Sequence, residues 1–307
     1  MNQGEMKALL SRSVINLDKP QGPSSHQVSA WIRDIFGVAR AGHGGTLDPN
    51  VTGVLPVALE NATKALDALL YGDKEYVCAM KLHRDVPRDK VLSVLREFTG
   101  EVYQTPPLRS AVKKELRVRR IYDIHVIEME GRDVLFRARC QSGTYIRTLC
   151  NDVGEALGSG AHMDDLRRTR TACFGEDDSV SPQEVRDAFE YWKESGDDVP
   201  IRTILLPMER LLEHLPKVVL RGSAVDSVCH GADLAAPGMD SADRKIRKGD
   251  AVAMFSPKGE AVALGSCLVN LEEGVSKKGI VIDTKRVFME AGTYPRMWKT
   301  REKERPV

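Results

Sequence analysis

The segment of the chain best suited to chemistry is 42–53, GHGGTLDPNVTG, which sets one carboxylate, Asp48, among conformationally permissive residues. Three glycines precede the acid, and Pro49 fixes the backbone dihedral φ directly after it. A loop of this composition can bring its backbone and its carboxylate close to a ligand.

Two other interpretations of this loop are open from the residues alone. In one, segment 42–53 is an ordinary Gly/Pro turn, and Asp48 only hydrogen-bonds its own backbone. In the other, the glycines cradle a phosphate group. The phosphate interpretation is the weaker one, because no Lys followed by Ser or Thr closes the loop as in a Walker A motif.

The neighbouring segments form elements that can position this loop. Residues 14–17 are a short apolar strand, and a helix follows that Ser24 or Ser25 can cap and that ends at Gly37. After the loop, 54–59 is a buried strand. Strand 76–82 then alternates, and by itself its first residue, Tyr76, is typical of a core or edge aromatic.

A second strand and helix pair follows later in the chain. Segment 134–140 alternates cleanly between apolar and polar residues, and the helix that begins near 146 repeats apolar residues on one face until Gly158. Arg147 lies in the first turn of that helix. An arginine in such a place is usually a surface residue.

Segment 102–122, VYQTPPLRSAVKKELRVRRIY, is the most basic part of the chain. Six basic residues surround one acid there, a density that suits phosphate binding, although a solvated basic loop or hairpin has the same composition. The six residues are Arg109, Lys113, Lys114, Arg117, Arg119 and Arg120.

Length and composition set the outer limits. The chain has 307 residues, of which 42% are hydrophobic and 29% charged, and this predicts a globular protein of about two domains. No apolar run resembles a signal peptide or a membrane span, so we expect a cytoplasmic protein with no membrane partner. The net charge of +1 predicts no nucleic-acid partner by itself, so a polyanion site must come from local clusters. Beyond Pro216 the pattern changes to short strands, which is typical of a small barrel.

These segments resemble the motifs of a known family when they are taken in order. NLDKPQGPSSH, GTLDP, KEY and SGTYIRTL resemble the motifs of the TruB and dyskerin class of pseudouridine synthases. Beyond Pro216, HGADLAAPG and GIVIDTKRVFM resemble the PUA domain attached to the archaeal and eukaryotic members. The resemblance runs from Val14 to Trp298 and implies an archaeal-type catalytic subunit of an H/ACA ribonucleoprotein.

The resemblance implies roles for individual residues. Asp48 is the nucleophile, Tyr76 stacks on the target base, and Arg147 pairs with an active-site carboxylate, which keeps the acid ionised. The substrate-binding residues that it implies are His43, Asp85 and Leu149. The basic segment corresponds to a clamp that closes over RNA, and it is shorter than in stand-alone bacterial enzymes.

The implied fold is α+β, with a mixed β-sheet and flanking helices in the catalytic domain and a small β-barrel, the PUA domain, after it. The limits that we expect are a lead-in at 1–13, the catalytic domain at 14–215, the PUA domain at 216–298 and a basic tail at 299–307. The lead-in is shorter than in archaeal relatives, where extra residues pack on the PUA domain.

The implied reaction is the isomerisation of uridine to pseudouridine in rRNA and tRNA, without metal or organic cofactor. The implied partners are H/ACA guide RNA, the substrate RNAs, small H/ACA partner proteins and a kink-turn-binding protein. Three alternatives are open at this point: a stand-alone tRNA pseudouridine synthase acting on the T-arm, a non-catalytic RNA-binding scaffold, and a two-carboxylate hydrolase using Asp48 and Asp85.

Overall fold

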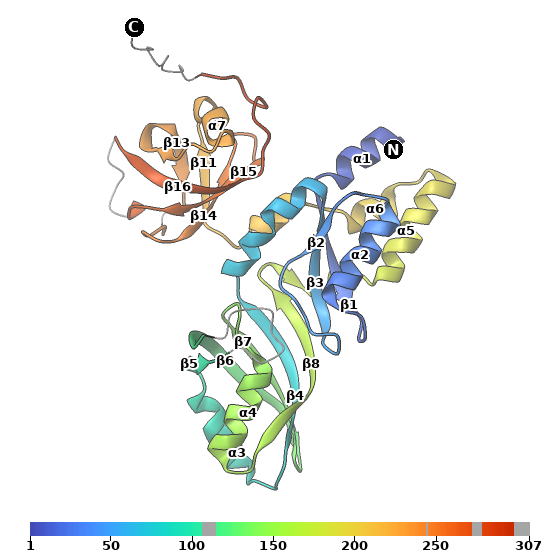
Figure 1. Ribbon diagram of the computed structural model, residues 1–307, viewed down its shortest axis with the longest axis vertical. Coiled ribbons are helices and arrows are strands. Elements are labelled where there is room, and N and C mark those ends of the chain that lie inside the picture. The colour runs from blue at the N-terminus through green and yellow to red at the C-terminus, as the bar shows by residue number, and fades with distance from the viewer. Residues whose placement is uncertain (106–114, 244, 272–277, 298–307) are drawn as a thin grey trace. The chain divides into compact units, whose positions relative to one another are not determined.

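The structure is a computed structural model of the whole chain, and it describes every residue except 106–114, 244, 272–277 and 298–307 (Figure 1). The chain divides into two compact units, Met1–Leu206 and Pro207–Val307. In the described residues, no helix is long and apolar enough to cross a membrane.

The first unit is built on a mixed sheet whose described strands run in the order β10-β1-β3-β8-β4-β7-β6-β5. Two short strands extend it, because β2 pairs with β3 and β9 pairs with β8. Most pairings are antiparallel, but β3 and β8 run parallel. The strands are β1 (Ser13–Lys19), β2 (Ala41–His43), β3 (Thr52–Leu59), β4 (Lys74–Leu82), β5 (Gly100–Gln104), β6 (Arg117–Glu130), β7 (Asp133–Cys140), β8 (Ala161–Thr171), β9 (Phe174–Gly175) and β10 (Leu206–Pro207).

Helices cover the two halves of this sheet separately (Figure 1). One hydrophobic core lies between β1, β3, α2 and α5, and a second lies between β4, β7, α3 and α4. The helices are α1 (Gln3–Leu10), α2 (Ser25–Phe36), the 3-10 helix η1 (Glu60–Tyr71), α3 (Arg88–Glu97), α4 (Ile146–Leu157), α5 (Pro182–Ser195) and α6 (Val199–Ile204).

The two helices expected from the sequence, one ending at Gly37 and one ending at Gly158, begin and end where predicted. The Ser24 side chain accepts from the backbone N–H of Gln27 and caps α2, and Gly37 ends that helix in the left-handed conformation at φ 63°. In α4 the predicted apolar face is buried and Gly158 ends the helix at φ 71°. The expected strand 134–140 is found as β7, with its alternate residues buried.

A short parallel ladder joins the two halves of the sheet. It pairs only Thr52 with Arg167 and Gly53 with Arg168. Gly53 has φ +103°, and a Cβ atom built on it would lie 2.2 Å from the carbonyl oxygen of Arg168. Only glycine fits there, so this residue permits the close approach of β3 and β8.

The second unit is a six-stranded sheet in the order β12-β16-β15-β14-β11-β13, packed against helix α7 (Gly222–Cys229). Only β11 and β14 run parallel among its pairings in the described residues. The strands are β11 (Lys217–Leu220), β12 (Leu234–Ala235), β13 (Met239–Ala242), β14 (Ala251–Phe255), β15 (Ala261–Cys267) and β16 (Ile280–Val287). The expected α+β class with a mixed sheet is confirmed.

The division between the units falls before the change to strands at Pro216. The reason is the 3-10 helix η2 (Met208–Leu212), which belongs to the second unit. Its Glu209 side chain accepts a 3.1 Å hydrogen bond from the backbone N–H of Ala261 at the start of β15.

We predict that Gly53→Ala destabilises the first unit far more than a matched glycine replacement does. The control is Gly100→Ala, because Gly100 has φ +125° but an added Cβ atom would meet nothing within 4 Å. Backbone strain alone costs about 1–3 kcal/mol. The added contact with the Arg168 carbonyl should raise the cost for Gly53 beyond about 4 kcal/mol. Urea unfolding of both variants measures the difference, and equal losses would contradict this account of the ladder.

Candidate active site

Asp48 and Arg147 form an ion pair at the surface of the first unit. The Arg147 Nη2 atom donates to the Asp48 Oδ2 atom at 2.5 Å. The Asp48 side chain is 54% exposed and that of Arg147 45%, so the pair is open to a ligand. Asp48 comes from the loop before β3 and Arg147 from the first turn of α4, so the pair joins the two halves of the sheet.

Tyr76 lies beside this pair. It is half-buried near the start of β4 and packs against the second core. Burial raises the pKa of its phenol, with the charge of Asp48 adding to the effect, and the Arg168 guanidinium acts in the opposite direction. Tyr76 is therefore a protonated phenol at neutral pH, and it lies within electrostatic reach of the Asp48 carboxylate.

Lys19 holds the backbone of the loop that carries Asp48, residues 44–51 between β2 and β3, which is called the Asp48 loop below. It is fully buried at the end of β1 and donates from Nζ to the carbonyl oxygens of Pro20, Pro49 and Val51 at 2.9, 3.0 and 2.9 Å. These bonds use all three ammonium protons. Burial lowers the pKa of Lys19, and the nearby charge of Asp48 partly offsets that effect.

Ser25 fixes the other side of the same loop. Its hydroxyl accepts from the backbone N–H of Leu47 at 2.8 Å and donates to the Leu47 carbonyl at 2.9 Å. The Leu47 and Val51 side chains are buried in the second core. The loop is thus tied to the first half of the sheet by polar bonds and to the second by apolar contacts, while Asp48 between them stays exposed.

Arg168 on β8 lies fully buried behind the loop. It donates from Nε to the carbonyl of Val54 at 2.8 Å and from Nη2 to the carbonyl of Gly45 at 3.0 Å. It also lies opposite Tyr76 in the register of β4 and β8. One guanidinium therefore contacts the Asp48 loop and strand β3 beside the tyrosine of β4.

His43, at the end of β2, is held by two hydroxyl groups. Its Nδ1 lies 3.0 Å from the Ser29 hydroxyl oxygen and its Nε2 lies 3.4 Å from the Thr46 hydroxyl oxygen. Burial lowers the pKa of His43 to about 4, and the nearby His26 and Arg168 contribute to the shift. His43 is therefore neutral at physiological pH and supports the start of the loop as a hydrogen-bonding group.

Leu149 lies in the second core and is 0% exposed. It lies two residues after Arg147 on α4, so it faces the opposite side of the helix from the ion pair. In this structure Leu149 presents no surface to a ligand. Leu149 contributes to the site by forming part of the hydrophobic core against which Tyr76 packs.

Asp85 does not lie at this site, contrary to expectation. It is exposed in the loop after Leu82, and β4 extends about 20 Å between Tyr76 and Leu82. That end of the strand bonds to the connection between α4 and β8, because the backbone N–H of His83 donates to the carbonyl of Gly160. A hydrolase that pairs Asp48 with Asp85 needs carboxylates about 5–9.5 Å apart, and the fold does not provide this spacing.

The predicted basic cluster is only partly described. Arg109, Lys113 and Lys114 lie outside the described residues. Arg117 and Arg119 lie half-buried on one face of β6, and Arg120 lies exposed on the other. The alternation of the strand therefore divides these three arginines between two surfaces.

Three supporting residues were not predicted as site residues from the sequence: Lys19, Ser25 and Arg168. A signal existed for Lys19, because it directly follows the apolar run 14–17 and precedes a proline. Arg168 is one of several arginines in a basic strand, and its type gives no indication that it is buried.

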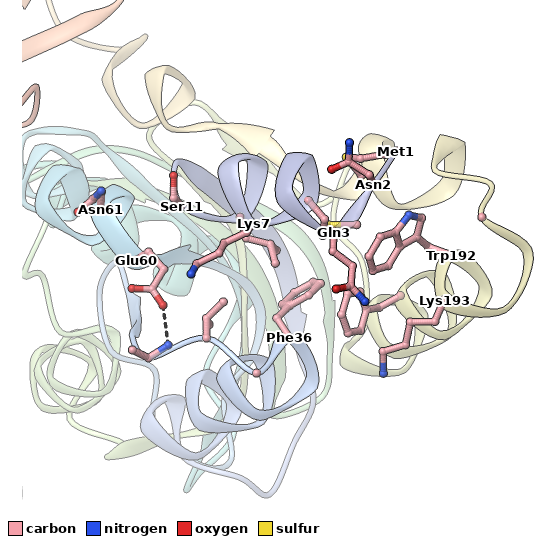
Figure 2. A pocket seen from close by; sticks show the side chains of 17 residues that line it. Met1, Asn2, Gln3, Lys7, Ser11, Phe36, Glu60, Asn61, Trp192 and Lys193 are labelled. Carbon is pink, nitrogen blue, oxygen red and sulfur yellow. Dashed lines mark hydrogen bonds between the residues drawn. The ribbon is translucent and has the colours of Figure 1, made fainter. Parts of the chain in front are cut away.

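A cavity of about 1150 Å³ lies elsewhere in the first unit, between α1, the end of α2 and α5 (Figure 2). Figure 2 shows Phe36, Gln3 and Trp192 facing the same space, with Lys7 and Glu60 toward the other side. None of the residues that line this cavity belongs to the Asp48 site. Among the described residues, no cluster of three or more His, Cys, Asp or Glu side chains could hold a metal ion.

The arrangement suits covalent chemistry on a neutral, planar group. An exposed carboxylate can attack a ligand, a guanidinium can balance its charge, and a phenol can pack against a ring while donating or accepting a proton. Hydrogen bonds from Lys19, Ser25 and Arg168 hold the backbone of the loop that carries Asp48.

Family models match most of the chain. The N-terminal domain of the TruB family of pseudouridylate synthases matches residues 33–89 and 83–146, and the C-terminal domain of tRNA pseudouridylate synthase B matches 147–213. The PUA domain matches 216–288, and the DKCLD (NUC011) domain matches 3–29. The resemblance stated from the motifs is therefore confirmed.

Curated relatives and solved structures agree with these matches. The chain is 56% identical to the probable tRNA pseudouridine synthase B of Methanopyrus kandleri, over 94% of this chain and 86% of the relative. It is 51% identical to that of Methanocaldococcus jannaschii, over 97% of this chain and 89% of the relative.

Two solved structures share the fold. One belongs to a Cbf5–Nop10–Gar1 complex, with a TM-score of 0.90, 51% identity and coverage of 95% of this chain and 89% of that one. The other belongs to an H/ACA ribonucleoprotein bound to a substrate RNA containing 2′-deoxyuridine, with a TM-score of 0.86, 48% identity and coverage of 95% and 90%. The exposed carboxylate, its guanidinium partner and these matches together show that the chain belongs to the TruB family of pseudouridylate synthases.

Proposed function

We propose that this pseudouridine synthase works as the catalytic subunit of an H/ACA guide-RNA ribonucleoprotein and modifies uridines in rRNA and tRNA. The similarity to one chain from a Cbf5–Nop10–Gar1 complex and to another from an H/ACA particle bound to substrate RNA supports this. The partners are a guide RNA, the substrate RNA, small H/ACA proteins and a kink-turn-binding protein. We place the protein in the cytoplasm.

The observation that carries the catalytic proposal is the contact of Arg147 with Asp48 beside Tyr76. The target uridine is flipped out of the RNA so that its reacting atoms reach Asp48. The Asp48 carboxylate attacks, and the bond between N1 of the base and C1′ of the sugar breaks. C5 of the base then bonds to C1′, the bond that Asp48 formed breaks and restores the free carboxylate, the proton on C5 leaves, and N1 gains a proton, so that atoms and charge balance.

The neighbouring groups have distinct parts in this reaction. Arg147 balances the charge of Asp48 while the carboxylate is free. Tyr76 stacks on the base near the C5 proton. His43, neutral and held by two hydroxyls, contacts the RNA around the flipped uridine. No metal or organic cofactor has a part in these steps.

RNA is held by two further regions in this proposal. The basic segment with Arg109, Lys113 and Lys114 and the three arginines of β6 closes over the substrate. The second domain holds guide RNA, with limits of 216–298 for the PUA domain and 14–215 for the catalytic domain.

A stand-alone tRNA pseudouridine synthase is the second candidate. The observation that favours it is the name of the relatives, each described as a probable tRNA pseudouridine synthase B. In that case the chain would act on the T-arm of tRNA without guide RNA or partner proteins.

We predict that Asp48→Asn abolishes tritium release from RNA labelled at C5 of uridine. The loss should exceed about 10³-fold, because an amide cannot act as the nucleophile. Release from tRNA alone would indicate the stand-alone enzyme, and release that needs guide RNA and partners would indicate the guided one. Asp85→Asn makes the same change at a carboxylate far from the site and should stay within about twofold. Full activity of Asp48→Asn would contradict the proposal.

We predict that Arg147→Lys lowers the single-turnover rate by about 10²–10³-fold while RNA affinity is retained. A lysine keeps the charge but not the planar guanidinium that places the Nη2 donor on Asp48. Filter binding and single-turnover kinetics separate the two effects. The control is Arg186→Lys, which changes an exposed arginine on α5. A rate within about twofold of the parent for Arg147→Lys would show that the pair does not contribute to catalysis.

We predict that Lys113→Glu with Lys114→Glu weakens RNA binding and reduces its salt dependence. Each lost phosphate contact lowers the slope of log affinity against log salt by about 0.7–0.9. The control is Lys193→Glu, which changes an exposed lysine on α5. An unchanged salt slope for the double variant, measured by RNA titration at several salt concentrations, would remove these lysines from the RNA-binding surface.

A further inference from the structure

Arg168 is a buried cation that the proposed reaction steps do not use. It is 1% exposed and lies at the centre of the sheet, where β8 pairs with β3 on one side and with β4 on the other. Its register partners are Gly53 and Tyr76. A buried charge is costly unless hydrogen bonds satisfy it, so a specific function has to justify an arginine here.

The described hydrogen bonds of this guanidinium go to two carbonyls. Nε donates to Val54 and Nη2 donates to Gly45. The register of β8 against β4 sets Arg168 opposite Tyr76, so the two side chains are cross-strand neighbours on one face of the sheet. The positive charge of Arg168 acts on the Tyr76 phenol and opposes the rise in its pKa that burial causes.

The space around Arg168 is matched to its planar head group. A Cβ atom on Gly45, at φ +83°, would lie 3.2 Å from the Nη1 atom. The loop that carries Asp48 is therefore pressed directly against the guanidinium. A lysine has one compact ammonium, which cannot reach Gly45 and Val54 from one position as the rigid fork does.

We propose that Arg168 is a positioning residue that sets the Tyr76 hydroxyl and the Asp48 loop in a fixed relation to one another. It acts through Tyr76 and the Gly45 carbonyl and does not touch the RNA. This inference rests on the proposed function, in which Asp48 attacks the uridine and Tyr76 stacks on the detached base. The base must be held between these groups while its bond to the sugar moves from N1 to C5. A displacement of about 1 Å at such a point costs on the order of 10²-fold in rate.

The test is a double-mutant cycle in the fully assembled particle with guide RNA and partner proteins. The variants are Arg168→Lys, Tyr76→Phe and the two combined, measured by single-turnover pseudouridine formation at saturating RNA. We expect Arg168→Lys to lower the rate about 10²-fold with RNA affinity retained within about twofold. In the Tyr76→Phe background the same change should cost at least about fivefold less, because the hydroxyl on which Arg168 acts is already absent. Rate losses that simply multiply would overturn the proposal.

Arg170→Lys is the matched control for this cycle. Arg170 lies on the same strand, is 40% exposed and pairs with Glu75 at 3.7 Å. The proposal requires its rate to stay within about twofold of the parent. An equal loss for Arg170→Lys and Arg168→Lys would indicate a general effect on β8 and would overturn the specific role.

A spectroscopic measurement keeps the proposal testable if Arg168→Lys does not fold. Tyr76→Phe leaves the ring and the buried charge in place, and it should shift the Nε–H resonance of Arg168 in the full-length protein. An unchanged resonance would overturn the proposal. This readout does not depend on catalysis. Retained activity of Asp48→Asn would contradict the proposed function but would not affect the inference about Arg168 and Tyr76. The two failures are therefore distinguishable.

Discussion

The fold of the first unit depends on a parallel ladder of two residue pairs between β3 and β8. This ladder joins two half-sheets that otherwise have separate helices and separate hydrophobic cores. Gly53 lets the strands approach so closely that no side chain fits between them. Asp48 comes from the loop that enters the ladder, and Arg147 and Tyr76 come from the other half of the sheet. The site exists only where the halves meet, so the geometry of the ladder is also the geometry of the site.

Two buried cations stabilise this junction through backbone carbonyls. Lys19 bonds to Pro20, Pro49 and Val51, and Arg168 bonds to Gly45 and Val54. Either cation would attract a carboxylate strongly at close range in a low-dielectric interior. Because their described hydrogen bonds go to backbone carbonyls, they order the loop without holding its acid. Asp48 is left to pair with an exposed arginine, from which a substrate can displace it.

Local signals in the sequence predicted several of the elements and drew attention to Asp48. Tyr76 and Arg147 were given site roles by the family resemblance, since by themselves the one is typical of a core aromatic and the other of a surface arginine. Strand alternation, helix caps and the Gly/Pro composition around Asp48 are visible within a few residues. The placement of Asp85 was not predictable in this way, since its distance from Asp48 depends on the length of β4 and on the contact of His83 with Gly160. Arg168 was missed for a related reason. Its burial results from pairing with two strands distant in sequence, and no property of its own segment indicates this.

The exposure of the Asp48–Arg147 pair points to the part that RNA has in completing the site. An ion pair about half exposed to water contributes about 0–1 kcal/mol and is readily exchanged. In the proposed reaction, a flipped base that covers the pair excludes water and strengthens the electrostatic interactions around the carboxylate. In that proposal the protein supplies an open pair on a loop held by hydrogen bonds, and the substrate supplies the dry surroundings. Because the flipped base belongs to the RNA, the protein alone can fix only the positions of the groups that the base will cover.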